Sequence, residues 1–179
     1  MYYSVIKPCD IANGPGCRTV LFVSGCTHHC KGCFQPQTWN FTYGTPFTEA
    51  TVEELLQDLS KSYVTGLTLL GGEPFEPENQ PELVKLLRRV RAELPGTTIW
   101  AFSGYTYEQL TGESPANCGS LTEEYLTLID VLVDGEFVEE KKSLSLRFRG
   151  SSNQRILDMP KTRAAGTPIL WDDGAMAGH

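Results

Sequence analysis

The sequence predicts an α/β protein in which a curved parallel sheet forms a partial, open TIM-like β/α barrel. Short apolar segments typical of buried strands alternate with amphipathic helical segments, which is the pattern of right-handed βαβ units. The chain has 179 residues, fewer than the roughly 250 that a closed eight-stranded barrel usually takes. We therefore expect a single domain over residues 1–165 and a loose C-terminal tail over residues 166–179.

The N-terminal part leads into the first strand. Residues 1–15 are expected to be irregular or extended, and they end on a strong turn signal, Asn-Gly-Pro-Gly, at residues 13–16. Residues 19–23 are rich in β-branched and aromatic side chains, which is typical of a buried strand. A loop that carries three cysteines follows this strand directly.

The remaining elements continue the alternation of helix and strand. Residues 48–60 and 80–94 carry apolar side chains at helical spacing, and Thr48 can cap the first of these helices. The other expected elements are strands over residues 67–70, 98–102, 130–133 and 144–148, one helical turn over 107–110 and a short helix over 121–128.

The composition limits the class of partner and the compartment. A net charge of −7 argues against non-specific binding of nucleic acid, which relies on a basic surface. No apolar run approaches the ~20 residues of a membrane helix, and the N-terminus lacks the layout of a signal peptide. We therefore expect a cytoplasmic protein without a nucleic-acid or membrane partner. In that compartment, clustered cysteines favour metal or redox chemistry.

Three cysteines stand in the spacing C-x3-C-x2-C at Cys26, Cys30 and Cys33. Several thiolates within one short turn can bind a single metal or cluster. A closed zinc site needs four ligands, and so does a cubane cluster held entirely by cysteines. Three ligands therefore favour a site with one open position for a small molecule. The other cysteines, Cys9, Cys17 and Cys118, are expected to be ordinary packed or surface thiols.

Two alternatives for the cysteine loop stay open. A zinc site could take His28 or His29 as its fourth ligand, although both lie between two cysteines, where a tight turn makes joint ligation awkward. We expect both histidines to be solvated loop residues. A redox disulfide between Cys30 and Cys33 is the other alternative, but it gives Cys26 no role.

Further motifs follow the C-terminal ends of the expected strands, at the edge where parallel α/β sheets bind ligands: Gly71-Gly72-Glu73-Pro74, Ser103-Gly104-Tyr105 and Asp134-Gly135-Glu136. In the first motif the glycines allow a ligand to approach the backbone, and the Glu73 carboxylate suits an ammonium group. Pro74 stiffens the exit from the turn. The motifs together predict a site for a small zwitterion beside the three cysteines.

The cysteine triplet with the adjacent aromatic Phe34, together with the motif at residues 71–74, resembles the radical S-adenosylmethionine superfamily. The resemblance implies a radical SAM type of barrel and one [4Fe–4S] cluster held by Cys26, Cys30 and Cys33. The amine and carboxylate of S-adenosylmethionine would take the fourth iron. The other cofactor-binding residues that the resemblance implies are Gly32, Cys33, Phe34, Gly71, Gly72, Glu73, Pro74 and Ser103.

The match is closest to the glycyl-radical-enzyme activases. Gly14-Pro15-Gly16 followed by Arg18 and Phe22 is similar to that branch. Motifs in the family's order over residues 10–154 resemble the activating proteins of the anaerobic (class III) ribonucleotide reductase. Gln35 departs from the pattern, which usually has asparagine there. The reaction implied is reductive cleavage of S-adenosylmethionine to a 5′-deoxyadenosyl radical, which takes a hydrogen from a glycine of the reductase.

The resemblance also implies partners. These are the large subunit of the anaerobic ribonucleoside-triphosphate reductase, through its glycine-radical loop, and a low-potential electron donor such as flavodoxin. A homodimer is left open. The competing functions are activation of another glycyl radical enzyme of the formate-lyase type and a non-catalytic zinc-binding interaction module. Asp134 and Glu136 are weaker candidates for the site, and Arg149 with residues 151–153 could contact either cofactor or partner.

Overall fold

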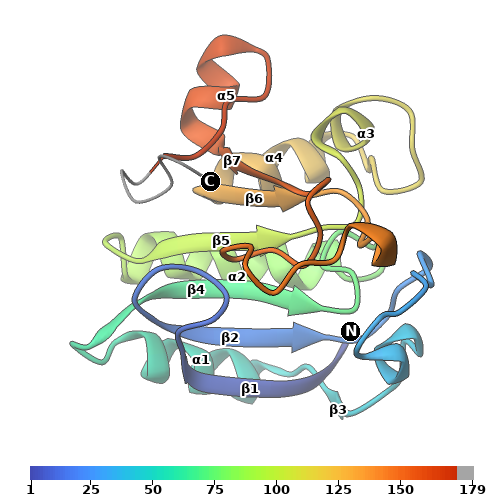
Figure 1. Cartoon of the computed structure of the whole chain (residues 1–179). Helices are drawn as coiled ribbons and strands as arrows, with labels where there is room; N and C mark the ends of the chain where they lie inside the picture. Colours follow the sequence, from blue (N-terminus) through green and yellow to red (C-terminus); the bar gives the residue numbers. More distant parts are fainter. Residues whose placement is uncertain (173–179) are drawn as a thin grey trace.

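The computed structural model describes residues 1–172, and over these residues the chain forms one seven-stranded sheet in the order β3-β1-β2-β4-β5-β6-β7 (Figure 1). The strands are β1 Tyr2–Asp10, β2 Cys17–Val23, β3 Thr45–Pro46, β4 Val64–Gly71, β5 Thr98–Phe102, β6 Val131–Asp134 and β7 Arg155–Asp158. The helices are η1 Pro36–Trp39, α1 Glu49–Leu59, α2 Gln80–Glu93, α3 Tyr107–Thr111, α4 Ser120–Leu128, η2 Glu139–Lys141 and α5 Met159–Ala165.

The middle of the sheet is parallel and its margins are antiparallel. β2, β4, β5 and β6 pair in parallel, whereas β1, β3 and β7 join as antiparallel strands. Within the described residues the sheet does not close on itself, because β3 and β7 remain its two edges. The prediction of an open α/β sheet is confirmed. The finer assignment to a partial TIM-like barrel of the radical SAM type stays a prediction.

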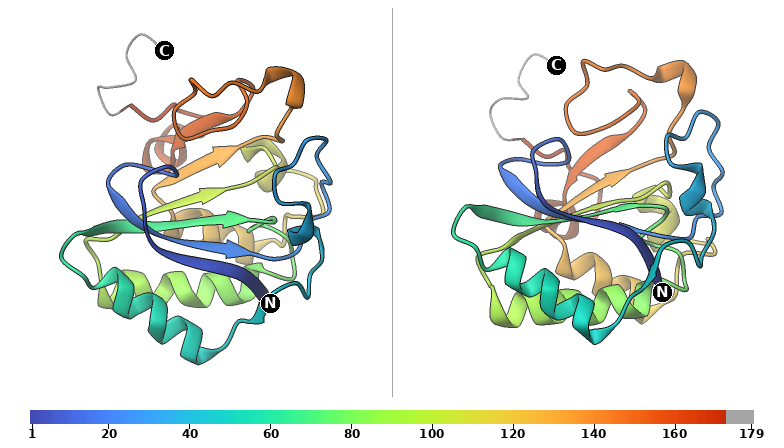
Figure 2. Two further views of the ribbon diagram at one scale, coloured as in Figure 1. Left: turned by 60° about the horizontal axis from the view of Figure 1, so that its bottom comes forward. Right: turned by 90° about the horizontal axis from the view of Figure 1, so that it is seen from below.

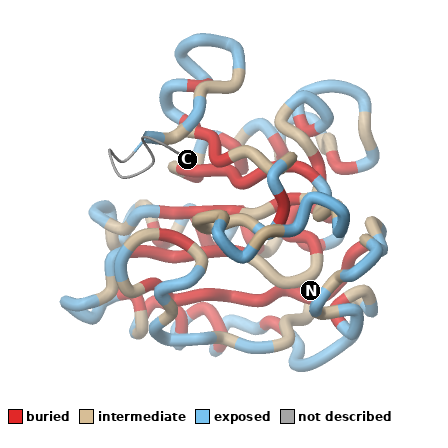
Figure 3. Tube along the Cα trace, in the orientation of Figure 1, coloured by how far each residue is buried: buried red, intermediate tan, exposed pale blue. Residues whose placement is uncertain are grey.

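The main core lies between the sheet and the helices that cover one of its faces (Figure 2). Thr48 and Thr51 form a capping box that starts α1, and the apolar side of α1 packs on the sheet with residues such as Leu55. Alternate strand residues, among them Leu21 and Leu69, point into this core. The central strands are consequently buried along most of their length (Figure 3).

The opposite face of the sheet carries a smaller cluster around Trp100. Phe148 and Trp171 pack edge-on against the Trp100 ring, at centroid distances of 5.4 and 4.9 Å. No helix covers this cluster in the described part of the chain; loop segments cover it instead (Figure 2). The helix-free face is therefore where loops from the C-terminal half meet the strand ends.

The predicted fifth strand over residues 144–148 is wrong. Its apolar–polar alternation is typical of a strand, but Phe148 has a positive φ of 60° and Leu144 is 95% exposed. The edge position belongs to β7, which pairs antiparallel with β6 and runs into α5. Neither β7 nor α5 was expected from the sequence.

The first residues of the predicted loose tail return to the sheet. The amide of Trp171 donates to the carbonyl of Ile156, and Leu170 forms an antiparallel bridge with Leu157. Residues 173–179, the rest of that predicted tail, lie outside the described residues. None of the helices among residues 1–172 combines the length and apolarity needed to cross a membrane.

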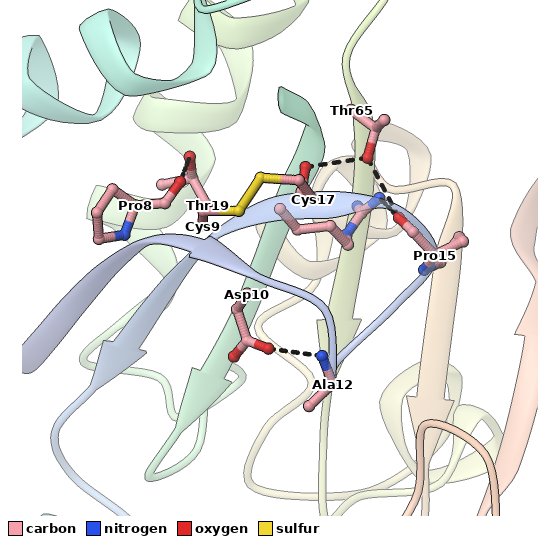
Figure 4. Close-up of a disulfide and its surroundings, with 9 residues drawn as sticks. Pro8, Cys9, Asp10, Ala12, Pro15, Cys17, Thr19 and Thr65 are labelled. Atoms are coloured by element: carbon pink, nitrogen blue, oxygen red, sulfur yellow. Dashed lines mark hydrogen bonds between the residues drawn. A yellow bond between two sulfur atoms is a disulfide. The ribbon is translucent and has the colours of Figure 1, made fainter. Parts of the chain in front are cut away.

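The prediction for Cys9 and Cys17 as ordinary thiols is also wrong. Their sulfurs form a disulfide, with the Cα atoms 5.3 Å apart, at the closed end of the β1–β2 hairpin (Figure 4). The intervening loop is held by Thr65, whose hydroxyl donates to the carbonyls of Pro15 and Cys17. These two cysteines face each other across the antiparallel pairing of β1 with β2, a pairing that was not expected from the sequence.

Candidate cluster and cofactor site

A cavity of about 390 Å³ lies at the C-terminal end of the parallel strands. The cysteine loop after β2, the turn after β4 and the end of β5 all contribute to its wall. Residues 142–150 enclose it from the helix-free face. The sequence predicted that these strand ends meet, and the structure confirms it.

The cysteine loop is folded back by hydrogen bonds to η1 and the residues beside it. The amide of Gly25 donates to the carbonyl of Thr38 over 2.7 Å, and the amide of Cys26 donates to that of Trp39 over 3.4 Å. Gly25 has a φ of 103°, and a Cβ atom there would lie 2.4 Å from the Phe41 ring. Because the loop folds back in this way, Cys26, Cys30 and Cys33 all lie in the cavity wall.

The three cysteines are free thiols with different burial. Cys26 is buried, whereas Cys30 and Cys33 are half-buried. Burial raises the pKa of Cys26 to about 12, and the charges of Glu73 and Glu76 add to this. Burial also raises the pKa of Cys30. These sulfurs therefore hold their protons until a metal displaces them, so loading of the site releases protons.

The donor set fits an iron–sulfur cluster. Each iron of a [4Fe–4S] cubane binds one ligand from the protein in addition to the inorganic sulfides. Three free thiols around one cavity would therefore leave one iron without a protein ligand. Among the described residues no three His, Cys, Asp or Glu side chains form a ready-made metal-binding group. Cys118, which the sequence analysis set aside, lies outside the cavity wall and is also a free thiol.

Glu73 is at the centre of the polar contacts below the cavity, and its side chain is only 1% exposed. One carboxylate oxygen accepts from the amide of Phe75 and the hydroxyl of Ser103, over 2.8 and 2.9 Å. The other accepts from the amide of Gly104 over 2.7 Å and pairs with His28 Nε2 over 2.9 Å. The side chain that the sequence assigned to an ammonium group is thus occupied by protein donors.

His28 connects the cysteine loop to two strand ends. Its Nδ1 lies 2.9 Å from a carboxylate oxygen of Glu136, opposite the contact with Glu73, and its ring lies 4.4 Å from that of Tyr105. Burial lowers the pKa of His28, but the two carboxylates outweigh this and raise it to about 9. His28 is therefore a buried imidazolium at neutral pH, and the expectation of a solvated loop histidine is wrong.

The other histidine of the loop has a separate role. His29 stacks on Trp39 at a centroid distance of 4.3 Å and has a positive φ of 51°. This stacking fixes the turn between Cys26 and Cys30 against η1. Neither histidine is free to join the cysteines without breaking these contacts.

Close packing requires two glycines at the end of β4: Gly71, its last residue, and Gly72, which follows it. A Cβ atom on Gly71 would lie 2.5 Å from the carbonyl oxygen of Val23, and one on Gly72 would lie 2.6 Å from that of Gly25. The amides of Gly72 and Glu73 donate to these same carbonyls over 2.8 Å each. What this turn can offer an ammonium group is therefore carbonyl oxygens, which accept hydrogen bonds.

The structure separates the predicted cofactor residues into two groups. Those that line the cavity are Gly32, Cys33, Phe34, Gly71, Gly72 and Ser103. Glu73 and Pro74 lie behind the wall, and the Pro74 carbonyl accepts from the Tyr125 hydroxyl over 3.3 Å. Ser103 reaches the cavity, but its hydroxyl donates to Glu73. It therefore supports the wall as well as forming part of it.

The acidic motif after β6 has a structural explanation. Asp134 is fully buried and pairs with the guanidinium of Arg155, and it accepts from the amide of Tyr107 over 2.7 Å. Glu136 bonds to His28, as described above. Both residues orient the loops around the cavity and do not line it.

Sequence reasoning missed Glu76 and His28 as parts of this arrangement. Glu76 is buried and accepts from both the amide and the hydroxyl of Thr27, over 2.8 and 2.7 Å. It follows the Gly-Gly-Glu-Pro turn by two residues, so a second acid close behind the motif was the available signal. For His28 there was none, because its partners lie 45 and 108 residues away in the sequence.

Residues 12–157 match the family described as a 4Fe-4S single cluster domain. The anaerobic ribonucleoside-triphosphate reductase-activating protein of Escherichia coli K12 is 44% identical over 158 residues, which cover 87% of this chain and 97% of the relative. The protein of the same name from Enterobacteria phage T4 is 44% identical over 156 residues, covering 87% and 93%.

A third relative extends the comparison to another bacterium. The protein of that name from Pasteurella multocida is 42% identical over 158 residues, 87% of this chain and 96% of the relative. The matched residues 12–157 include every loop that lines the cavity.

Proposed function

This chain belongs to the family of anaerobic ribonucleoside-triphosphate reductase-activating proteins, and from this premise we propose that it generates the glycyl radical of that reductase. The observation that carries the proposal is the placement of three free thiols and the Gly71-Gly72 backbone in the wall of one cavity. A radical oxidoreductase of this kind needs both parts at one point: ligands for the cluster and acceptors for the methionine amine.

Residues of this chain would hold both cofactors. Cys26, Cys30 and Cys33 would each bind one iron of a single [4Fe–4S] cluster. The carbonyls of Gly71 and Gly72 would accept from the ammonium group of S-adenosylmethionine. When bound, this pair would supply the chemistry of one-electron reductive cleavage of S-adenosylmethionine, with an external reductant as the electron source, and hydrogen abstraction from a glycine of the reductase.

The remaining cofactor contacts follow the loop that carries the cysteines. We assign the backbone around Gly32, Cys33 and Phe34 to the adenine, because these residues line the cavity next to the last cysteine. Apolar side chains in the same wall, among them Leu70 and Phe102, would exclude water from the reacting atoms. Glu73, which lies behind the wall, and Ser103, which is part of it, would hold the turn after β4 against the end of β5 through their hydrogen bond.

The rim of the cavity supports a protein as the substrate. Phe34 is 80% exposed and Leu144 is 95% exposed, and both lie at the cavity wall. Exposed apolar side chains beside a site favour contact with a macromolecule. We assign this rim to the glycine-radical loop of the reductase's large subunit. We further propose a low-potential electron donor such as flavodoxin, a cytoplasmic location and a homodimer.

The test is anaerobic reconstitution with iron and sulfide, followed by incubation with S-adenosylmethionine, a reductant and the reductase. We expect about four irons per chain and a glycyl radical signal on the reductase by electron paramagnetic resonance. Cys118→Ala serves as the matched control, since its thiol lies outside the cavity. One zinc per chain without iron would instead support the zinc-binding interaction module. A radical on a formate-lyase type enzyme alone would support the other activase.

A further inference from the structure

Arg149 lies in the cavity wall together with the three cysteines. The chain connects them closely: Gly150, the next residue, packs against the Phe137 ring, where a Cβ atom would meet a ring carbon at 3.1 Å. Phe137 in turn lines the cavity, and its backbone bonds to the Cys30 thiol. The loop segment that carries Arg149 is thus on the same side of the cavity as Cys30.

The other polar side chains of this loop are already used to build it. The Gln154 side chain accepts from the amides of Gly150 and Ser151, over 2.9 and 3.1 Å, and donates to the carbonyl of Gly135. Asn153 donates to the carbonyl of Glu136 over 2.8 Å and accepts from the hydroxyl of the fully buried Ser151 over 2.7 Å. These contacts fix residues 150–154 against the strand end after β6.

Arg149 differs because its donors are not all used. One terminal nitrogen donates to the carbonyl of Gln154 over 2.6 Å, whereas Nε is buried without a hydrogen-bond partner among the described residues. No salt bridge joins Arg149 to an acid within residues 1–172. Native proteins rarely leave a buried donor of this kind unpaired, so the guanidinium of Arg149 retains donor capacity that the chain itself does not use.

The charge of the wall indicates the kind of group that would use this donor capacity. In the part of the chain that the structure describes, the lining includes the cations Lys142 and Arg149 but no Asp or Glu. A cationic wall in a chain of net charge −7 favours an anionic group on the ligand. The guanidinium fork matches a carboxylate with two parallel hydrogen bonds.

We propose that Arg149 binds the carboxylate of the methionine part of S-adenosylmethionine and thereby selects ligands that carry it. The inference rests on the proposed function, because that function brings this amino acid into the cavity. The ammonium end of the ligand would lie with the Gly71 and Gly72 carbonyls and its carboxylate with Arg149, since all three residues line the one cavity. Lys142, which is exposed, contributes charge at the rim without fixing the carboxylate.

The experiment measures equilibrium binding to the cluster-loaded protein of two ligands: S-adenosylmethionine and its decarboxylated analogue. Arg149→Gln is expected to weaken binding of S-adenosylmethionine by about ten- to hundredfold, the effect of one charged hydrogen-bonded pair. Binding of the decarboxylated analogue is expected to change less than about twofold, because the group that Arg149 recognises is absent. Arg149→Lys, which keeps the charge, should recover part of the loss.

Two control variants locate the effect. Arg147→Gln removes a cation from the same segment, outside the cavity wall, and should leave both affinities unchanged. Lys142→Gln removes the other long cation of the wall and should change both affinities by less than about twofold, because Lys142 is exposed and its charge is screened by solvent. Iron content and far-ultraviolet circular dichroism identify any variant that has lost the cluster or the fold. If Arg149→Gln is such a variant, the affinities of Arg149→Lys for the two ligands are compared instead.

The outcomes separate this inference from the function on which it rests. If the unaltered protein binds no S-adenosylmethionine, the proposed function fails and the assignment of Arg149 fails with it. If the protein binds it but Arg149→Gln weakens both ligands equally, the function stands and Arg149 only supports the cavity or the cluster. Selective loss in Lys142→Gln instead would assign the carboxylate to Lys142.

Discussion

At the N-terminal end of β2, Arg18 is fully buried, and neutral oxygens hold its guanidinium. Its nitrogens donate to the hydroxyls of Thr68 and Thr98 and to the carbonyls of Pro15, Leu67 and Thr98, over 2.9 to 3.3 Å. At the C-terminal end of the same strand, Cys26 is buried as a free thiol, and His28 joins Glu73 to Glu136.

The polar groups at the two ends of β2 have different roles: those at the N-terminal end are structural, and those at the C-terminal end are functional. Burial lowers the pKa of Arg18 to about 10, so the side chain is still protonated at neutral pH, and its hydrogen bonds are complete within the chain. The C-terminal end keeps three thiols and an unpaired Arg149 Nε beside a cavity. We infer that the N-terminal end stabilises the fold, whereas the C-terminal end is completed by ligands.

The largest effect is expected at the C-terminal end. Cys26→Ala removes one of three cluster ligands, and we expect iron content after anaerobic reconstitution to fall from about four per chain to background. The free energy of unfolding of the metal-free protein should change little in comparison. An iron content that survives in Cys26→Ala would assign the third ligand to another residue and remove the contrast between the two ends.

Arg18→Ala should produce the opposite pattern. It leaves a buried cavity and several oxygens without their donor, so we expect a loss of about 4 kcal/mol in the free energy of unfolding, measured with urea on the metal-free protein. Protein that remains folded should still bind the full complement of iron. Arg18→Met, which fills most of the volume, is the control and should cost less. Loss of iron in folded Arg18→Ala would show that the ends are coupled.

Glu73→Gln tests the polar contacts below the cavity. The carboxamide presents an NH2 group to the donors at Gly104 and His28, so we expect a loss of about 3 kcal/mol in the free energy of unfolding. Affinity for S-adenosylmethionine should fall as well, because the turn after β4 loses its hydrogen bonds to the residues that follow β5. Glu78→Gln changes an exposed acid close by and should do neither. Unchanged stability in Glu73→Gln would contradict the buried pairing.

The smallest of the four effects is expected at the disulfide. Cys9→Ser opens a loop of eight residues' separation, which by chain entropy costs about 2.5 kcal/mol in the free energy of unfolding. Iron content should not change, because the bond lies at the N-terminal end of β2. Cys118→Ser, at a free thiol, is the control. Equal stability of oxidised and reduced protein would show that the hairpin holds without the bond.

The parallel strands and the two main helices were predictable because their patterns are local. Residues 98–102 carry enough apolar character to identify β5, and Thr48 marks the start of α1. β7 was not predictable, because four residues at a sheet edge give little pattern. Residues 144–148 show the apolar–polar alternation of a strand without forming one. In the structure, Phe148 of this segment packs on Trp100, whereas Leu144 is exposed.

For the site, the sequence identified the residues of the cavity wall but not the hydrogen-bonded pairs that support them. Cysteine spacing and paired glycines are local signals, and the structure brings both to one cavity. The support depends on distant pairs, such as His28 with Glu136 and Glu73 with Gly104, which no local pattern shows. The role predicted for Glu73 shows the limit: the motif located the residue, but only the fold shows that its carboxylate is occupied.

The Cys9–Cys17 bond affects how reducing equivalents are counted. β2 runs from Cys17 to Val23, a rise of roughly 20 Å, so the disulfide and the cysteine loop are two separate sulfur centres on one strand. A disulfide accepts two electrons when a dithiol reduces it, in addition to those that a cluster takes. A reductive titration of the whole protein will therefore overstate the electrons delivered to the cluster, unless the Cys9–Cys17 pair has been reduced or replaced beforehand.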